Sequence, residues 1–312
     1  MNLKKTLSAL VASLLLIALA TGCTTPASTV ENKWGIDKFV MVLLPQEGNP
    51  TFWATRKVFD DALSEVIGIP VEEYIATDYT ACIEAMRTGQ ASFADFGPLA
   101  YVFARERAEA ECLVNQASWN ENTGEYSVGY YCWIIVREDS DIYTLDDLEG
   151  RSFGFIDPAS TSGNLVPCHE ILTHFNAKEG YSDLTFEDLH VNDKFFSSVT
   201  MAGTHDNAIN AVYLGDIEAA GVASTSYQAM VANGMVNENE IRIIKSSPLI
   251  PTDPWAIKGS LPQELKDLVK DFLLSFDDPA YFGEGSKNCF LPVEDSVYDY
   301  LRDLRDRYNL SE

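Results

Sequence analysis

The chain has 312 residues, of which 46 % are hydrophobic and 11 % aromatic, so it can bury a substantial core. Its formal net charge of -25 at pH 7 repels nucleic acid and anionic lipid surfaces, which argues against a nucleic-acid-binding role. A site for a small anion is not excluded, because backbone N–H groups and helix N-termini bind anions locally whatever the net charge.

The N-terminus has the features of an exported lipoprotein. Lys4 and Lys5 precede an apolar run over residues 7–20, which has signal-peptide length and is short for a membrane span. The run ends in Ala20-Thr21-Gly22-Cys23, which resembles the lipobox whose cysteine is acylated in bacterial lipoproteins. We expect a signal peptide over residues 1–22, lipidation at Cys23 and a flexible tether over residues 23–35. An ordinary cleaved signal and a buried N-terminal helix are the alternatives.

Strands and helices alternate through the first part of the folded region. In chain order, the pattern predicts a strand over residues 39–44, a helix over 51–67, a strand over 71–76, a helix over 79–87, a strand over 91–96 and a helix over 99–110. The first strand (FVMVLL) is a continuous apolar run, which is typical of a strand buried on both faces. Gly68 and Gly89 follow the first two helices as termination signals.

The second part repeats this order. It predicts a strand over residues 152–156, a loop and helix over 160–175, a strand over 189–195, a helix over 205–214, a strand over 217–223 and a helix over 226–232. Two apolar segments, 128–136 and 241–257, are expected to cross between the halves, and helices over 261–276 and 294–308 to complete the first. The pattern indicates an α/β protein with lobe 1 over 36–136 and 241–312, lobe 2 over 137–240, and two hinge strands. A single three-layer α/β domain is the alternative.

A run of small polar residues follows the predicted strand over residues 152–156. Asp157-Pro158-Ala159-Ser160-Thr161-Ser162-Gly163 stands between this strand and a helix. Serine and threonine are good N-caps, so capping alone is one explanation. Three consecutive hydroxyl residues followed by glycine also place several O–H and N–H donors at the positive end of a helix, which suits a tetrahedral oxyanion.

Five segments together resemble the phosphate/phosphite/phosphonate-binding family of ABC-transporter solute receptors. In chain order they are TDY over residues 77–79, ADFGPLAYV over 94–102, YTLDDLEGR over 143–151, FGFIDPASTSGNLVP over 153–167 and GTHDNA over 203–208. The resemblance covers roughly residues 38–275, with the motifs in the family's order. It implies the type II periplasmic-binding-protein fold, an α/β clamshell of two lobes joined by two hinge strands.

The resemblance also implies which side chains hold the ligand, a small phosphorus oxyanion. In such receptors a helix N-terminus of one lobe holds the phosphoryl group, and tyrosines of the other lobe and of the hinge close over it. The matching residues here are Ser160, Thr161, Ser162, Gly163, Tyr79, Tyr130, Tyr101 and His205. Packing in the core or on the surface is the alternative role for each tyrosine. His205 is expected to bind an anion more strongly when protonated.

Two further observations bear on the pocket. Gln46 and Glu47 follow the first predicted strand and are candidate pocket residues of undetermined effect on the ligand. Residues 222–225 read Val-Ala-Ser-Thr, without the carboxylate that some relatives that bind aminoalkylphosphonates carry near this strand end. We therefore expect a ligand without an amino group.

Catalytic chemistry is not indicated by the sequence. It lacks the Walker A, G-x-S-x-G, H-E-x-x-H and G-x-G-x-x-G motifs, so we expect no enzyme and no cofactor. The cysteines other than Cys23 lack metal-site spacing, and both disulfides and buried thiols are compatible with them. The expected partners are the ligand, ABC permease subunits and the membrane that holds the lipid, with the protein facing the periplasm or cell exterior. A receptor for a sulfonate or another organic anion, or a ligand sensor for a membrane kinase, is the alternative.

Overall fold

The computed structural model describes residues 33–46, 50–121 and 123–311. The chain divides into two units, residues 1–36 and 37–312, and the second is the folded body. The expected signal peptide, Cys23 and Glu47 fall outside the described residues, so the statements about them stay predictions. Within the described part, no helix combines the length and apolar character that crossing a bilayer requires.

The first lobe is built on a mixed sheet with the strand order β14-β4-β13-β3-β1-β2, and β5 pairs with β4. Its strands are β1 (Phe39–Leu43), β2 (Val71–Ile75), β3 (Phe93–Asp95), β4 (Ala110–Asn120), β5 (Glu125–Ser127), β13 (Pro254–Lys258) and β14 (Cys289–Pro292). β1 runs parallel to β2 and β3, whereas β13 is antiparallel to both β3 and β4. Phe39, Met41, Val42 and Leu43 of β1 are fully buried, as the apolar run predicts.

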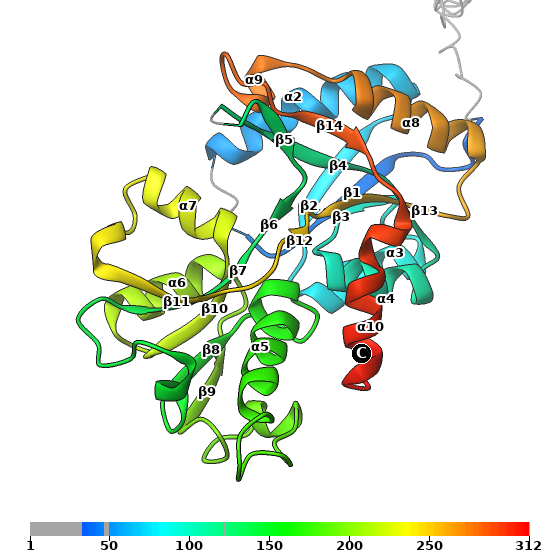
Figure 1. Ribbon diagram of the computed structural model, residues 1–312. Coiled ribbons are helices and arrows are strands. Elements are labelled where there is room, and N and C mark those ends of the chain that lie inside the picture. The colour runs from blue at the N-terminus through cyan, green and yellow to red at the C-terminus, as the bar shows by residue number, and fades with distance from the viewer. Residues whose placement is uncertain (1–32, 47–49, 122, 312) are drawn as a thin grey trace, which may run out of the picture. The chain divides into compact units, whose positions relative to one another are not determined.

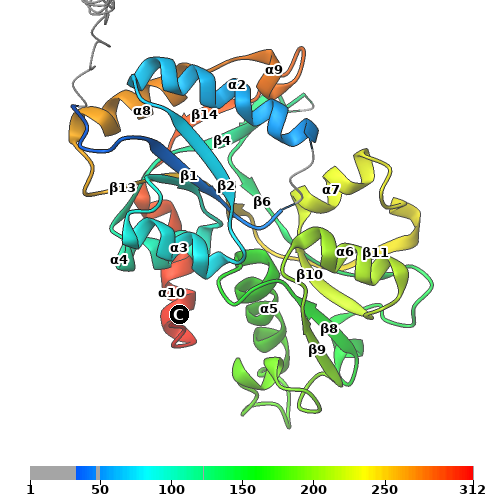
Figure 2. The same ribbon diagram turned by 180° about the vertical axis from the view of Figure 1, so that it is seen from behind.

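Helices cover both faces of this sheet (Figures 1 and 2). They are α2 (Pro50–Ile67), α3 (Tyr79–Thr88), α4 (Pro98–Arg107), α8 (Gln263–Ser275), α9 (Pro279–Phe282) and α10 (Asp299–Arg307), with a short 3-10 turn, η5 (Asp295–Tyr298), before α10. α2 and α8 lie on one face, and α3 and α4 on the other. Asp78 caps α3 by accepting the Ala81 N–H, and Gly89 ends it in the left-handed conformation, so Tyr79 is the first helical residue.

The second lobe is built on a five-stranded sheet with the order β11-β7-β10-β8-β9. Its elements are β7 (Cys132–Arg137), β8 (Ser152–Phe155), α5 (Val166–Phe175), β9 (Ser198–Met201), α6 (His205–Leu214), β10 (Ala219–Ala223), α7 (Ser224–Ala232) and β11 (Ile241–Ser246), with 3-10 turns η1 (Leu145–Leu148), η3 (Glu187–His190) and η4 (Glu238–Glu240). Ile134 and Val136 of β7 belong to the same core cluster as the buried face of α5, whereas Ile135 clusters with that of α6. The sheet therefore separates α5 from α6, as period-2 alternation requires.

Two segments connect the lobes within residues 37–312, and they pair with each other. β6 (Gly129–Tyr130) and β12 (Ile250–Pro251) form a short antiparallel ladder in which Ile250 faces Tyr130. The prediction of a two-lobed α/β fold with two hinge strands is confirmed. β7 and β11 both belong to the second sheet, so the strands of lobe 2 extend beyond the predicted limits at residues 137 and 240.

The prediction of a strand over residues 189–195 is wrong. Residues 187–190 form η3, and the strand of this region is β9, at Ser198–Met201. Phe195 and Phe196 are both buried, and they pack against Phe175 and Phe153 with ring centroids 4.7 and 4.6 Å apart. Two consecutive buried aromatic side chains do not fit the alternation of a strand with one exposed face, and here they mark an irregular segment under the sheet.

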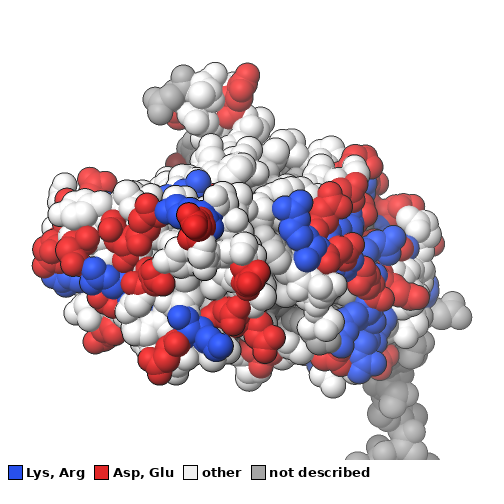
Figure 3. Space-filling model, turned by 60° about the horizontal axis from the view of Figure 1, so that its bottom comes forward, with Lys and Arg blue, Asp and Glu red and all other residues white. Residues whose placement is uncertain are grey.

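The charge of the folded body is spread rather than gathered on the face shown in Figure 3, where acidic and basic side chains are interspersed. Many exposed acidic side chains have a basic neighbour, as in the pairs Lys57–Asp61 and Lys38–Glu72. Such exposed pairs contribute little to stability, and their carboxylates are largely solvated. The electrostatic potential inside an enclosed site is therefore determined mainly by the groups that line it and not by the net negative charge of the chain.

Candidate ligand-binding site

A cavity of about 330 Å³ lies where the two lobes and the crossing segments meet. Its walls come from the residues that follow the C-terminal ends of β1, β3, β8 and β10, together with Tyr130 of β6 and residues 252–255. In α/β sheets, the crevice outside the carboxyl ends of the strands is the usual place for a ligand. Six of the predicted ligand residues line it: Ser160, Thr161, Ser162, Tyr79, Tyr130 and His205.

The Ser160 loop, defined as residues 157–163, joins β8 to the start of α5. The helix opens with a π-type turn over Thr161–Leu165, and Ser160 caps it because its Oγ accepts the Gly163 N–H at 3.1 Å. The Ser160 carbonyl accepts the Leu165 N–H. The N–H groups of Thr161 and Ser162 precede any intrahelical partner, so they are donors at the positive end of the helix. The loop thus combines capping with early helix N–H groups on residues, Thr161 and Ser162, that line the cavity.

Gly163 supports the loop from behind and does not line the cavity. A Cβ added at Gly163 would lie 2.0 Å from Ile156 Cγ1 and 2.5 Å from Ile156 Cβ. The backbone at this position therefore packs directly on the side chain that ends β8. The role in ligand contact that the resemblance implies is replaced by one in close packing.

Tyr79 and Tyr130 approach the loop from the first lobe and from the hinge. The side chain of Tyr79 pairs with that of Ser160, and that of Tyr130 pairs with those of Ser162 and Thr161. Burial raises the pKa of both phenols, so their hydroxyl groups stay protonated and can donate to an anion.

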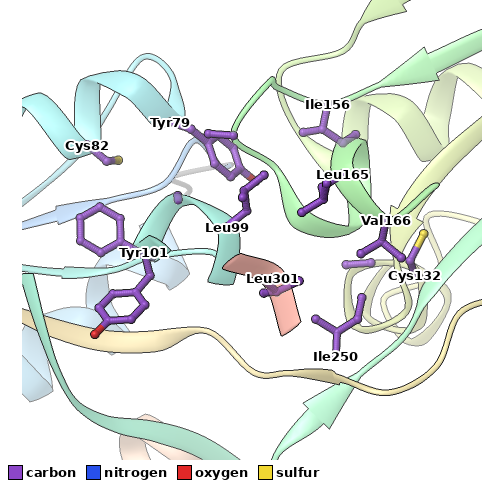
Figure 4. Close-up of a cluster of buried hydrophobic side chains, with 14 of the residues drawn as sticks. Tyr79, Cys82, Leu99, Tyr101, Cys132, Ile156, Leu165, Val166, Ile250 and Leu301 are labelled. Atoms are coloured by element: carbon purple, nitrogen blue, oxygen red, sulfur yellow. The ribbon is translucent and has the colours of Figure 1, made fainter. Parts of the chain in front are cut away.

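Tyr101 lies outside the cavity, which corrects its prediction as a ligand residue. It is fully buried in α4, donates a hydrogen bond to Asp295 Oδ1 and packs against Tyr298 with ring centroids 5.2 Å apart. Figure 4 shows its ring and hydroxyl turned away from Tyr79 and Ile156. The start of α4 faces the Ser160 loop instead, because the Leu99 N–H donates to Thr161 Oγ1 at 2.8 Å.

His205 lines the cavity as a neutral imidazole. Its Nδ1 accepts the Ala223 N–H at 3.2 Å, which leaves the proton on Nε2. Burial lowers the pKa of His205 to about 4. The expectation that protonation strengthens its contact with an anion is not supported, because a proton on Nδ1 would break the bond to Ala223. The neutral ring can still donate one hydrogen bond through Nε2.

Two carboxyl groups line the cavity that the sequence analysis did not predict. Asp95 ends β3, and its Oδ1 is buried without a hydrogen-bond partner. Burial raises the pKa of Asp95 to about 6, against the opposing charge of Arg56. Asp253 lies between β12 and β13 and is exposed to the cleft. The surrounding walls raise the pKa of Asp253 to about 7, and the charge of Asp95 adds to the effect.

Asp95 could have been predicted from the sequence, because it stands near the end of the predicted strand over residues 91–96 and within the family-like segment over residues 94–102. Asp253 gave only a weak signal, a carboxylate between Thr252 and Pro254 in a crossing segment. Gln46, a predicted candidate, also lines the cavity. Among the described residues that line this cavity there is no lysine or arginine, so neutral donors and the helix start supply its positive potential.

Arg56 lies beneath the cavity and is engaged with partners of its own. Its Nε donates to Glu73 at 2.8 Å, a second nitrogen also pairs with Glu73, and Nη1 donates to the Tyr281 hydroxyl at 2.9 Å. The guanidinium carbon lies 5.1 Å from the centre of the Trp255 ring, which forms part of the cavity wall. Arg56 therefore fixes the wall and moderates the charge of Asp95 rather than contacting a ligand.

The described cysteines, Cys82, Cys112, Cys132, Cys168 and Cys289, are free thiols, three of them buried. Among the described residues, no cluster of three or more histidine, cysteine or acidic side chains is arranged to hold a metal ion.

Two lobes that meet at a polar cavity, with two paired crossing strands between them, define a solute-binding protein of the clamshell type. Residues 41–298 match the family model for the periplasmic substrate-binding protein of phosphonate ABC transporters, and the chain belongs to this family. The family consists of substrate-binding components rather than enzymes, so the protein is exported and works with a membrane permease.

Two curated relatives agree with this assignment, and a solved structure shares the fold. The chain is 26 % identical to the phosphonates-binding periplasmic protein of Escherichia coli over 256 residues, covering 81 % of this chain and 69 % of the relative. It is also 26 % identical to the phosphate-import protein PhnD of Mycolicibacterium smegmatis, covering 94 % and 92 %. A binding component of a phosphonate ABC transporter from Pseudomonas aeruginosa shares the fold, with a TM-score of 0.72, 23 % identity, and 87 % and 86 % coverage.

Proposed function

We propose that this protein binds a small phosphorus oxyanion, a phosphonate, phosphite or phosphate, in the cavity between its lobes and delivers it to an ABC importer. The observation that carries the proposal is the Ser160 loop. Its helix start and hydroxyls line the same cavity as Tyr79 and Tyr130, whose side chains pair with those of the loop. The names of two relatives, a phosphonates-binding and a phosphate-import protein, support the same ligand class.

The donors suit a tetrahedral anion without help from a cationic side chain. Hydrogen bonds from N–H and O–H groups to an ionised acceptor are stronger than bonds between neutral groups, at about 1.5–3 kcal/mol each. Because Tyr79 and Tyr130 stay protonated and His205 offers Nε2–H, donors surround the site from several directions. This arrangement replaces the water around the anion when the cavity encloses it.

Asp95 and Asp253 add two carboxyl groups to the lining of the site. A ligand without an amino group was expected because residues 222–225 contain no carboxylate. The cavity, however, contains two carboxyl groups from other elements, so that absence no longer argues against an amino group on the ligand. They have two chemically distinct uses. When ionised, they attract a cationic group on the ligand; when protonated, they donate to an oxyanion or accept it without repulsion. The pH dependence of binding separates these uses.

Lobe closure is the proposed mechanism. Two hydrogen bonds already cross between the lobes at the cavity: Leu99 N–H to Thr161 Oγ1 at 2.8 Å and Tyr79 N–H to Asp157 Oδ2 at 3.3 Å. A ligand held by the Ser160 loop and by Tyr79 bridges the same two lobes. It stabilises the closed form by the difference in its affinity for closed and open states, and the β6–β12 ladder is the hinge.

Isothermal titration calorimetry of residues 33–312 tests the proposal. The panel is phosphate, phosphite, methylphosphonate and 2-aminoethylphosphonate, with sulfate and an alkylsulfonate as competing chemistries. Micromolar or tighter binding of a phosphorus compound is the expected result. Binding of only a sulfonate would show that the protein is a receptor for the alternative ligand class. If the folded, ligand-free protein binds none of these compounds, the Ser160 loop serves only to cap the helix.

We also propose that Cys23 carries the lipid that anchors the protein to its membrane. The support is the apolar run over residues 7–20 and the small residues before Cys23. Cys23→Ser should move the protein from the membrane fraction to the soluble exported fraction. Mass spectrometry of the membrane-bound wild type should find acyl chains on an N-terminal cysteine, and an unmodified N-terminal peptide would refute the anchor.

A further inference from the structure

His190 lies next to the Ser160 loop but outside the cavity. It is the last residue of η3, and its imidazole is stacked between the rings of Phe155 and Phe186, with centroids 4.5 and 4.9 Å away. Its spacing from the other histidines in the sequence predicts only a structural or surface role. The two aromatic faces fix the plane of the ring, so its two nitrogens can point in only two directions.

A chain of hydrogen bonds runs from His190 into the loop. His190 Nε2 lies 2.6 Å from Asn164 Oδ1, and Asn164 Nδ2 donates to the Pro158 carbonyl at 2.8 Å. Asn164 is buried in the first turn of the helix, one residue after the loop, whereas Pro158 stands near the loop's start. Asn164 therefore ties the two ends of the loop together, and His190 holds the Asn164 amide in place.

Both nitrogens of His190 face hydrogen-bond acceptors. Nδ1 lies 2.8 Å from the Phe186 carbonyl oxygen. Nε2 faces the side-chain oxygen of Asn164 rather than its nitrogen, because that nitrogen donates to the Pro158 carbonyl. A neutral imidazole has one N–H and can satisfy only one of these contacts. The imidazolium satisfies both. His205 is the opposite case, because its Nδ1 accepts an N–H and so requires the unprotonated nitrogen.

Burial opposes the charged form of His190. It lowers the pKa of this histidine, while the Phe186 carbonyl acts in the other direction. Two other titratable groups lie close to the ring or its stacking partner. Cys168 on α5 has its sulfur 3.9 Å from Nε2, and burial raises the pKa of its thiol. Tyr308, beyond α10, packs on Phe186, and burial raises the pKa of Tyr308 to about 12. Both therefore stay neutral near pH 7, and neither supplies a charge that would stabilise the imidazolium.

We infer that His190 is a positioning residue whose protonation is coupled to anion binding: the oxyanion in the cavity favours the imidazolium, and the imidazolium completes the brace that aims the Ser160 loop. The inference rests on the proposed function, because it assumes that an anion occupies the loop. Linkage makes the coupling reciprocal, so a rise of one unit in the pKa of His190 on binding equals a tenfold gain in affinity on protonation. Affinity should fall as the pH rises through the pKa of His190.

NMR titration of the imidazole nitrogens in ¹⁵N-labelled protein tests this directly. The His190 signals are assigned by loss in a His190→Gln variant and followed from pH 5 to 8.5, with and without saturating methylphosphonate, and again with inorganic phosphate. We expect the pKa of His190 to rise by at least about 0.5 unit with an anion bound. An unchanged pKa while calorimetry shows binding would overturn this inference alone. If neither probe binds, the titration is run with whichever phosphorus compound of the calorimetry panel does bind; if none of them binds, the proposed function has failed and this inference fails with it.

The variants supply a second readout. His190→Gln removes the titrating group, and His174→Gln is the matched control, because His174 pairs with Asp146 on the surface away from the loop. We expect His190→Gln to lose at least about twofold to threefold more affinity at pH 5.5 than at pH 8, while His174→Gln keeps the wild-type profile. An equal loss at both pH values would mean that His190 is only structural and would refute the coupling. If His190→Gln does not fold, assignment by Asn164→Asp and the wild-type NMR titration still decide.

Discussion

Gly163→Ala is the most direct perturbation of the proposed anion site, because it moves the loop without removing any donor. The new Cβ would lie 2.0 Å from Ile156 Cγ1, 2.5 Å from Ile156 Cβ and 2.8 Å from Ser160 Oγ. Ordinary contact begins near 3.4 Å, so the loop or Ile156 has to move by more than 1 Å. Ile156 is itself buried at the end of β8, and close-packed interiors yield little, so most of the movement falls on the loop.

The magnitude follows from hydrogen-bond geometry. N–H···O bonds work at 2.7–3.2 Å, so a shift of about 1 Å removes a donor from effective contact. Each bond to a charged acceptor is worth about 1.5–3 kcal/mol. Loss of one such bond therefore weakens binding by about 10- to 100-fold. The overpacking should also lower the free energy of unfolding by about 1–3 kcal/mol.

Calorimetry with the phosphorus compound that binds best, together with a thermal melt, measures both effects. Gly180→Ala is the control, because Gly180 has a positive φ of 90° but no neighbouring atom within 4 Å. It should cost about 1–2 kcal/mol in stability through backbone strain and leave affinity unchanged. A folded Gly163→Ala protein that binds within threefold of wild type would show that the anion is not held by this loop.

Three further predictions concern side chains. Thr161→Ala should weaken binding at least tenfold, about 1.4 kcal/mol, by removing one cavity hydroxyl. Tyr101→Phe should leave affinity unchanged and lower stability by about 1 kcal/mol, because its buried hydroxyl donates to the half-exposed Asp295. For a ligand without a cationic group, ionisation of Asp253 and Asp95 near pH 6–7 repels the anion, so affinity should fall as the pH rises. Asp253→Asn removes one of these charges. The variant should therefore bind the anion more tightly than wild type at pH 8.5 and equally well at pH 5.

Each of these has a distinct failing result. Unchanged affinity in Thr161→Ala would remove that hydroxyl from the site, and weakened binding in Tyr101→Phe would restore the tyrosine as a ligand residue. With 2-aminoethylphosphonate the Asp253→Asn effect at pH 8.5 should reverse in sign, because an ionised carboxylate attracts the ammonium. Comparison of variant with wild type cancels the ligand's own titration. The same sign for both ligands would show that Asp253 does not contact the ligand.

Some elements of the fold were predictable because a few consecutive residues determine their geometry. The apolar run of β1, the cap and glycine that bound α3, and the hydroxyl-rich turn after β8 each report the geometry of a few neighbouring residues. This turn is the Ser160 loop, and its donors come from consecutive positions. The strand β4 was not predicted, since its eleven residues mix buried and exposed positions without regular alternation.

The unpredicted parts of the site depend on contacts between distant segments. Asp95 and Asp253 lie 158 positions apart in the sequence and meet only because β13 pairs with β3. Tyr101 occupies a motif position that resembles a ligand residue, yet the helical turn directs it to Tyr298. The expectation that protonation of His205 strengthens binding missed its partner, because the Ala223 N–H that donates to His205 Nδ1 belongs to a different element. A single sequence does not contain these pairings.

The position of β13 also constrains the order in which the lobes can be completed. β13 lies between β3 and β4, and β14 lies on the far side of β4, so residues after 253 hold the first sheet together. A chain that emerges N-terminus first exposes unpaired edges on β3 and β4 while the whole of the second lobe is already present. The lobe that begins the folded body is therefore the last to close, and a fragment ending near residue 136 should not fold alone. A protein delivered across a membrane gains from this arrangement, because its core cannot assemble before its C-terminal segment arrives.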